Sequence, residues 1–253
     1  MGAESQALAG ARVVCRRARR LPRRVVGVGR VITSPQNQTL KLVRKLHARR
    51  WRDKLGLFFA EGEDLVDAAL EAGLEPVELL VAGETVTPEL LAQVSTLPHP
   101  ARAIAVFRRQ DLPVNEARPA ALALWRVGDP GNVGTLIRTA DAFGASIELS
   151  PGSADPTGPK ALRASAGAVF RVPLGEAVGQ RVGLVAHGGK PLSEVEFGDV
   201  TVFVVGAERE GLPEEVLARC DVVATIPTPG PAESLNVAAA GAIALFEWSR
   251  RSD

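Results

Sequence analysis

The sequence predicts an α/β protein in which a small N-terminal α/β domain precedes a larger C-terminal domain built on a parallel sheet. Short apolar runs alternate with amphipathic stretches along most of the chain, as expected when strands and helices follow one another. In the second half these runs are continuously apolar, which is typical of parallel strands covered on both faces. No apolar run reaches the roughly 18 residues that a membrane span requires, so we expect no membrane partner.

The first half is predicted to form a domain over residues 31–112. Its opening segment, 39–54, carries apolar residues at near-helical spacing among mainly basic side chains, and predicts a basic helix. The Pro-flanked, polar stretch 113–119 is predicted to be a linker. The remaining elements expected in this half are strands at 57–62, 77–82 and 102–107 and helices at 63–73 and 88–95.

The second domain is predicted to span residues 120–253 and to alternate more regularly. Its apolar runs are short enough for strands, and each is separated from the next by a helical or turn-forming stretch. We expect strands at 121–127, 146–150, 182–187, 200–206 and 222–227, and helices at 132–143, 159–166, 213–219 and 233–250.

Charge is distributed very unevenly. Residues 1–60 hold 15 Lys and Arg against two acidic residues, whereas the remainder holds 15 against 27. A segregated basic end is typical of proteins that bind a polyanion such as nucleic acid. We interpret residues 1–30 as a flexible basic arm. A disordered, solubilising tail and a mitochondrial transit peptide remain open as alternatives for this segment.

The cysteine and histidine content indicates neither disulfides nor a metal site. Two cysteines, Cys15 and Cys220, cannot form a disulfide framework, and with three scattered histidines they lack metal-ligand spacing. We therefore expect no metal and a reducing, cytoplasmic location.

Three segments in the second half place Gly, Asn, Glu, Ser or Arg where an apolar strand meets a helix: 129–145, 204–221 and 226–247. In α/β domains small-molecule sites form at such joints. No G-x-G-x-x-G opens a helix, and the stretch 152–160 does not fit a P-loop. A nucleotide-binding oxidoreductase or kinase-like domain is therefore disfavoured.

Individual residues in these segments have both structural and functional interpretations. Asn132 and Arg138 lie six residues apart, about 1.7 helical turns, and so near one face of a helix. Glu208 is either a partner for that pair or a solvated loop acid. Ser234 and Asn236 stand at a helix start, where such residues are first of all caps.

Together the three segments resemble the signature motifs of the SpoU (TrmH-type) branch of the SPOUT RNA methyltransferases. The resemblance covers roughly residues 120–250, including 159–173. Segments 34–46 and 58–70 are similar to the RNA-binding domain of members that act on ribosomal RNA. The resemblance implies a SPOUT fold with a trefoil knot, a homodimer with sites at its interface, and methyl transfer from S-adenosylmethionine to a ribose 2′-hydroxyl.

The resemblance also implies roles for particular residues. Arg138 would be the catalytic group at the ribose, with Asn132 orienting it. Because a guanidinium resists deprotonation, we favour phosphate anchoring and alkoxide stabilisation over a general-base role. Ser234 and Asn236 would lie near the methyl-transfer centre, with Glu208 as a partner of the Asn132–Arg138 pair. The backbones that would hold the adenosyl group are those of Gly206, Ile226 and Leu235.

We therefore expect a methyltransferase that acts on structured RNA, in particular ribosomal RNA. The alternative is a non-catalytic RNA-binding or ribosome-assembly protein on the same scaffold. The chain has no Tyr, so base stacking would depend on Trp51, Phe58 and Phe59, and binding mainly on phosphates and RNA shape. The small-residue helix 236–248 is either a dimer helix or a core helix. Basic residues of segment 39–54 are the candidates for RNA contact: Lys41, Arg44, Lys45, Arg49 and Arg50.

Overall fold

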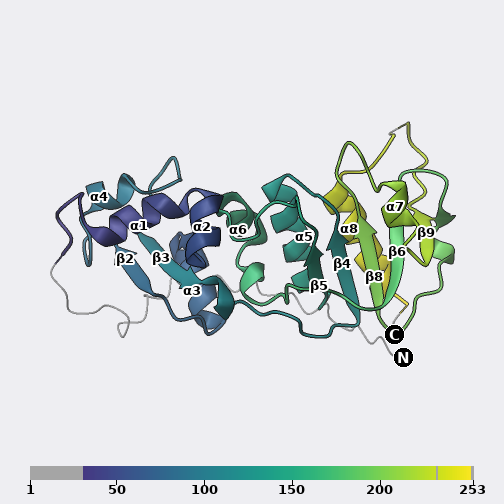
Figure 1. The fold of residues 1–253 in the computed structure, drawn as a ribbon, viewed down its shortest axis with the longest axis horizontal. Helices are drawn as coiled ribbons and strands as arrows, with labels where there is room; N and C mark the ends of the chain where they lie inside the picture. The colour runs from purple at the N-terminus through teal and green to yellow at the C-terminus, as the bar shows by residue number, and fades with distance from the viewer. Residues whose placement is uncertain (1–30, 232, 252–253) are drawn as a thin grey trace, which may run out of the picture.

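The computed structural model describes residues 31–231 and 233–251, so the basic arm expected at 1–30 lies outside the described residues. The N-terminal and C-terminal parts lie side by side along the long axis of the molecule (Figure 1). In the part of the chain that is described, no helix combines the length and apolar character needed to cross a lipid bilayer.

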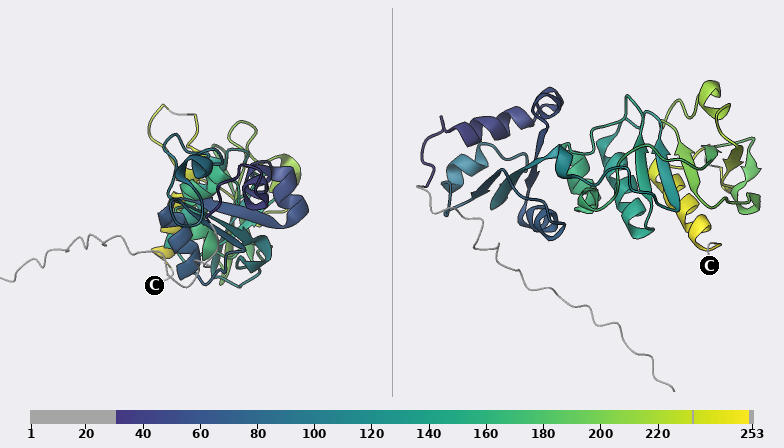
Figure 2. Two further views of the ribbon diagram at one scale, coloured as in Figure 1. Left: turned by 90° about the vertical axis from the view of Figure 1, so that its left-hand side faces the viewer. Right: turned by 60° about the horizontal axis from the view of Figure 1, so that its bottom comes forward.

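The N-terminal part is a three-stranded antiparallel sheet of order β1-β3-β2 with helices on both faces. One face packs on α1 and α4, and the opposite face on α3 (Figure 2). Its elements are α1 (Gln38–Leu46), α2 (Arg49–Leu55), β1 (Leu57–Glu61), α3 (Glu63–Glu71), β2 (Glu78–Val81), α4 (Pro88–Ala92) and β3 (Ala103–Arg108).

The segment 39–54 is helical, as its spacing predicts, but it forms two helices that are interrupted before α2. Helix α1 ends at Leu46 with His47 as its C-cap, and Ala48 has extended backbone angles of φ −91° and ψ 129°. The guanidinium of Arg52 donates hydrogen bonds from Nη1 to the carbonyl oxygens of Leu46 at 2.8 Å and His47 at 2.9 Å. The terminal carbonyls of α1 thus gain a side-chain donor that a continuous helix would not admit.

The C-terminal part is a six-stranded sheet of order β5-β4-β8-β6-β9-β7, and its strands pair in parallel, as predicted. Alternate residues of its central strands face two separate apolar clusters, one containing α5 and α8 and the other containing α7. Its strands are β4 (Ala120–Leu124), β5 (Ser146–Leu149), β6 (Gln180–Val185), β7 (Lys190–Pro191), β8 (Thr201–Val205) and β9 (Val222–Thr225).

The helices of this part are α5 (Pro130–Ala142), α6 (Pro159–Ser165), α7 (Glu214–Leu217) and α8 (Val237–Ser249). Helix α8 starts four residues later than the predicted 233, because Asn236 caps it by accepting hydrogen bonds from the backbone N–H groups of Ala238 and Ala239. The two-residue strand β7 was not predicted. The trefoil knot stays an expectation.

Helix α5 is held very close to its neighbours. A Cβ on Gly134 would lie 2.4 Å from the carbonyl oxygen of Ala161 in α6, and one on Gly241 of α8 would lie 2.4 Å from Cδ2 of Leu136. These glycines let three helices pack at short range, which fixes the start of α5 at the carboxyl edge of the sheet.

The two parts share an apolar core. The rings of Phe58 and Phe107 from the N-terminal sheet each lie 6.3 Å, centroid to centroid, from Phe170, which follows α6. The linker expected at 113–119 joins the second part by a hydrogen bond of 2.9 Å from the backbone N–H of Leu174 to the carbonyl of Pro113. The predicted boundaries at 31–112, 113–119 and 120–253 stay predictions.

Candidate functional site

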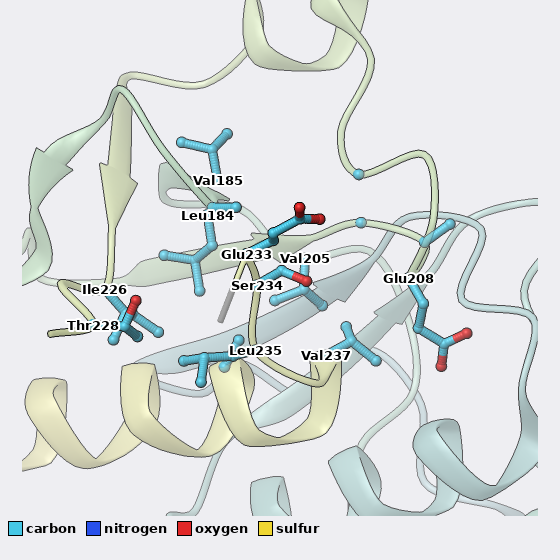
Figure 3. A pocket seen from close by; sticks show the side chains of 15 residues that line it. Leu184, Val185, Val205, Glu208, Ile226, Thr228, Glu233, Ser234, Leu235 and Val237 are labelled. Carbon is cyan, nitrogen blue, oxygen red and sulfur yellow. The ribbon is translucent and has the colours of Figure 1, made fainter. Parts of the chain in front are cut away.

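An open cleft lies at the carboxyl ends of β6, β8 and β9, beside the start of α8 (Figure 3). Its lining combines apolar side chains with a few polar groups, as in other small-molecule sites. The second and third motifs supply most of its walls, and the end of β6 supplies the rest. The lining residues are Leu184, Val185, Ala186, Val205, Gly206, Ala207, Glu208, Gly211, Ile226, Thr228, Glu233, Ser234, Leu235, Val237 and Ala240.

The predicted cofactor residues Gly206, Ile226 and Leu235 all line this one cleft. A Cβ on Gly206 would lie 2.3 Å from the backbone of Gly211, because the loop folds back and the N–H of Gly211 donates to the carbonyl of Ala207 at 2.8 Å. Glycine is therefore required at position 206, because the backbone of Gly211 occupies the space that a side chain would need. Gly206 itself is partly exposed and lines the cleft.

One end of the cleft is apolar. The side chains of Leu184, Ile226 and Leu235 gather there, and all three are partly exposed (Figure 3). Such a slot suits a flat, weakly polar group that gives up its contact with water on binding.

The opposite end carries a chain of polar side chains that joins all three motifs. Asn132, at the start of α5, donates from Nδ2 to a carboxylate oxygen of Glu208. Asn236 donates from Nδ2 to Oδ1 of Asn132 at 3.3 Å, while its own Oδ1 caps α8. The capping interpretation of Asn236 and its place in the site are thus compatible. Glu208 is a partner of Asn132 rather than an isolated loop acid.

Arg138 lies apart from this chain. It is exposed on α5, about 9 Å along the helix from Asn132 at 1.5 Å per residue, and it does not line the cleft of its own chain. Among the described residues, its guanidinium forms no hydrogen bond or ion pair, so the implied contact with Asn132 is not made. Arg138 is therefore available to an anion from outside the chain.

The start of α5 is fixed by Asp129, whose functional importance the sequence reasoning missed. Its carboxylate accepts hydrogen bonds from Nζ of Lys160 at 2.7 Å and from the backbone N–H of Asn132 at 2.9 Å. The Lys160 hydrogen bond, followed by that from Asn132, lowers the pKa of Asp129. Asp129 stands directly before Pro130, and an Asp before a Pro at the first helical position is a sequence pattern that predicts such a cap.

Two further cleft residues also went unpredicted. Glu233 lines the cleft with an exposed carboxylate, and Leu184 comes from the end of β6 (Figure 3). Glu233 lies within the third motif, but its position in the sequence does not distinguish a site residue from an ordinary surface carboxylate. No motif marks Leu184, because its position in the cleft depends on strand order.

The candidate RNA-binding residues lie on α1 and α2, but not all are free. Arg49 donates from Nη1 to the carbonyl of Ser153 in the second part at 3.0 Å, and Arg44 donates to the carbonyl of Pro35 at 3.2 Å. Within residues 31–231 and 233–251, the predicted side chains on these helices that form no hydrogen bond or ion pair are Lys41, Lys45 and Arg50, of which Lys45 contacts the Trp51 ring.

A basic–aromatic surface forms where α1 meets α2, from Lys45, Trp51 and Lys54. Both ammonium groups lie over the Trp51 ring, at 5.1 Å and 5.2 Å from its centroid. Trp51 is partly exposed, whereas Phe58 and Phe59 are buried and cannot stack on a base, which excludes two of the three expected stacking groups. Packing against the β1–β3 core explains their burial.

Comparisons with known proteins agree with this geometry. The family model described as "SpoU rRNA Methylase family" matches residues 119–246, and the model described as "MRM3-like substrate binding domain" matches residues 37–110. The chain is 33% identical to the 23S rRNA (guanosine(2553)-2′-O)-methyltransferase RlmP of Bacillus subtilis over 85% of this chain and 97% of that protein.

Solved structures are similar over most of their length. An AdoMet-bound rRNA methyltransferase from Sinorhizobium meliloti is 31% identical, with a TM-score of 0.79 over 88% of this chain and 98% of that one. The SpoU methyltransferase AviRb from Streptomyces viridochromogenes, also with AdoMet, is 26% identical with a TM-score of 0.75, over 86% of this chain and 98% of that one.

Proposed function

This chain belongs to the SpoU rRNA methylase family, and we propose that it transfers the methyl group of S-adenosylmethionine to a ribose 2′-hydroxyl of ribosomal RNA. The observation that carries the proposal is the polar chain Glu208–Asn132–Asn236, with Asn132 at its centre, which joins the three motifs at the edge of one cleft. A non-catalytic protein on this fold would not need to keep both these hydrogen-bonded side chains and the open cleft.

The residues of the cleft fit S-adenosylmethionine. The apolar slot of Leu184, Ile226 and Leu235 suits the adenine ring, and the partly exposed Gly206 offers neutral backbone hydrogen-bonding groups. The exposed carboxylate of Glu233 complements a cationic ligand. When bound, this cofactor supplies an electrophilic methyl group on a sulfonium centre.

The protein's own contribution is orientation and electrostatics. The Glu208–Asn132–Asn236 chain ties the loop after β8 to the starts of α5 and α8, which holds the polar end of the cleft in one geometry. Figure 3 places the Ser234 hydroxyl between the apolar slot and Glu208, where it can bind a ribose or cofactor oxygen.

Arg138 has the properties of an anion-binding group rather than of a base. A guanidinium stays protonated at physiological pH, and this one has no partner among the described residues. It can bind a phosphate of the RNA and stabilise the negative charge that develops on the ribose oxygen. The proton of that hydroxyl then leaves to solvent or to a nearby acceptor.

We further propose a homodimer, through the outer face of α8. That face is apolar, with Ala239, Ile243 and Phe246 at helical spacing, and Phe246 is 55% exposed. Arg138 does not line the cleft of its own chain, which supports a site completed by the second subunit. An active site at the interface is also what the family resemblance implies.

Ribosomal RNA is the proposed substrate, and the cytoplasm, where ribosomes are assembled, is the proposed location. The match to a substrate-binding domain, the basic–aromatic surface and the name of the Bacillus subtilis relative support this choice. We expect binding to depend on phosphate contacts and to weaken as salt rises.

The test is to incubate the purified protein with methyl-labelled S-adenosylmethionine and unmodified ribosomal RNA transcripts, and then to digest the RNA to nucleosides. We expect label in 2′-O-methyl ribose. RNA binding without any label, together with no heat of S-adenosylmethionine binding in calorimetry, would support the non-catalytic alternative instead.

A further inference from the structure

A buried ion cluster joins the two parts of the chain, away from the cleft. Its centre is Asp155, in the loop between β5 and α6, whose side chain is 6% exposed. Oδ2 of Asp155 accepts from Nε of Arg52 at 2.8 Å and from Nη2 of Arg109 at 2.6 Å. Oδ1 accepts from the backbone N–H and the hydroxyl of Thr157 at 2.9 Å and 2.7 Å. We call these four residues the Asp155 cluster.

The cluster reaches into the helices that carry the proposed RNA surface. Arg52 belongs to α2, is 5% exposed, and also donates to the carbonyls that end α1, at Leu46 and His47. Arg109 follows β3 and donates from Nη1 to Asp53 of α2 at 2.7 Å. One carboxylate of the second part therefore fixes α1, α2 and the end of β3 of the first part.

The Asp155 carboxylate is held in its charged form. Burial by itself would raise the pKa of Asp155, but the Thr157 hydroxyl and the charges of Arg109 and Arg52 more than offset this, and the pKa is lowered. A carboxylate with four hydrogen bonds and two guanidinium partners has a strongly preferred orientation. It tolerates little rotation of one part against the other.

Two other attachments lie away from the cluster. At the far end of β1, Nη1 of Arg163 in α6 donates to the hydroxyl of Thr96 at 3.0 Å, and Thr96 in turn donates its backbone N–H to Glu61. Glu61 and Leu57, the ends of β1, are about 13 Å apart at 3.3 Å per residue.

The third attachment is the apolar contact of Phe170 with the rings of Phe58 and Phe107. Close by, a Cβ on Gly167 would lie 2.6 Å from Cβ of Ala68 in α3. Figure 1 shows α6 beside α2, at the end of the first part that faces the second, and α6 packs near β1. The apolar contact alone leaves rotation about it possible, and the separated polar attachments remove that freedom.

We propose that Asp155 is a positioning residue that fixes the substrate-binding part on the catalytic part in one orientation. Given the proposed function, the chain then engages an RNA feature on α1 and α2 at a set distance from the cleft. The Asp155 cluster thereby determines which ribose of the bound RNA reaches the methyl group. This inference gives a specificity role to residues that touch neither cofactor nor RNA.

The first measurement is the distance between the two parts in solution, which does not depend on activity. Spin labels are placed on exposed positions of α4 and α7 by Glu89→Cys and Glu215→Cys, with Cys15 and Cys220 replaced by Ser. The full chain is used, diluted with unlabelled protein so that a distance between subunits does not contribute to the electron–electron dipolar signal.

We expect a narrow distance distribution for the wild type and a broadened or shifted one for Asp155→Asn. Arg109→Gln serves as a second variant that leaves the Arg52–Asp155 pair in place, in case Asp155→Asn fails to fold. The control is Asp53→Asn, since Asp53 is half exposed and contacts Arg109 and Arg49 within the first part. A distribution for both Asp155→Asn and Arg109→Gln as narrow and centred as that of the wild type would overturn the proposal.

The second measurement maps 2′-O-methylation on an unmodified ribosomal RNA transcript. Asp155→Asn is expected to keep its S-adenosylmethionine affinity, to lose kcat/KM for RNA on the order of 10²-fold, and to methylate neighbouring riboses. A loss of rate with unchanged site fidelity would reduce Asp155 to a stability role and contradict the proposal. If the wild type methylates no RNA, the proposed function fails, and the distance measurement still decides the orientation claim.

Discussion

Two polar groupings join distant segments of this protein, the Asp155 cluster and the Glu208–Asn132–Asn236 chain, and they differ most in their exposure to water. Asp155 and Arg52 are almost fully buried and charged, whereas Glu208 and Asn236 are exposed and Asn132 is partly exposed. Removing one partner from a buried pair leaves an uncompensated charge, whereas water replaces an exposed hydrogen bond that is removed. Stability and orientation should therefore depend on the first grouping, and catalysis on the second.

The largest expected effect on stability is that of Asp155→Asn. The change leaves the Arg52 guanidinium buried without its carboxylate, and should lower the free energy of unfolding by about 3 kcal/mol. Urea unfolding followed by circular dichroism measures it. Asp53→Asn, at the exposed edge of the same region, should cost less than about 1 kcal/mol. Equal stability of the two variants would contradict the contrast drawn between the groupings.

In contrast to Asp155→Asn, Arg138→Ala should lower activity without lowering the free energy of unfolding. Removal of one electrostatic group at the reacting oxygen is expected to lower kcat about 10²-fold. The affinity for S-adenosylmethionine, measured by calorimetry, should not change, since Arg138 does not line the cleft. The exposed Arg219, which follows α7, provides a matched control as Arg219→Ala. Turnover of Arg138→Ala at the control's rate would remove Arg138 from the mechanism.

Acid should act on the Asp155 cluster in a defined window. Although burial opposes it, the hydrogen bonds and charges around Asp155 lower its folded pKa, so the cluster contributes its full stability above the unfolded value of about 3.9. That contribution is lost as pH falls through the lower folded pKa. The stability difference between wild type and Asp155→Asn should therefore be constant above about pH 5 and shrink below about pH 4. A stability difference that shrinks near neutral pH would contradict a lowered pKa for Asp155.

The smallest effect concerns the basic–aromatic surface on α1 and α2. Replacing Lys45 and Lys54 with Gln should weaken RNA binding several-fold, and should reduce the slope of log affinity against log salt by roughly 0.7 to 0.9 for each phosphate that the protein no longer neutralises. Filter binding at several salt concentrations measures both quantities. The exposed Lys190 on β7 is the matched control, as Lys190→Gln. An unchanged salt dependence would show that Lys45 and Lys54 do not contact RNA phosphates and that RNA binds at another surface.

Much of this site could be predicted from sequence, because its residues stand at the ends of elements. Gly206, Ile226 and Leu235 follow strands or precede a helix, and parallel strands bring such positions to one edge whatever the details of packing. Asn236 was predicted as a cap and as a site residue, and both interpretations fit its hydrogen bonds. Arg138 lies on the predicted helix, where its guanidinium forms no hydrogen bond with Asn132, and its role stays a prediction.

The connection between the two parts was not predictable in the same way. Asp155 and Arg52 are far apart in sequence, and each alone is typical of a solvated surface residue. Their pairing depends on how two domains dock, and no local periodicity encodes this. The division of 39–54 into two helices has the same origin, because Arg52 needs the carbonyls at the end of α1.

The central claim is that the three motifs act as one site, and a double-mutant cycle of methyl transfer on Asn132 and Glu208 tests it most directly. Because the two side chains share a hydrogen bond, Asn132→Ala combined with Glu208→Ala should lose no more activity than the more severe single variant. All three variants should unfold at the wild-type urea concentration. Losses that simply multiply in the double variant, or full activity in either single variant, would show that these motifs do not form a common site.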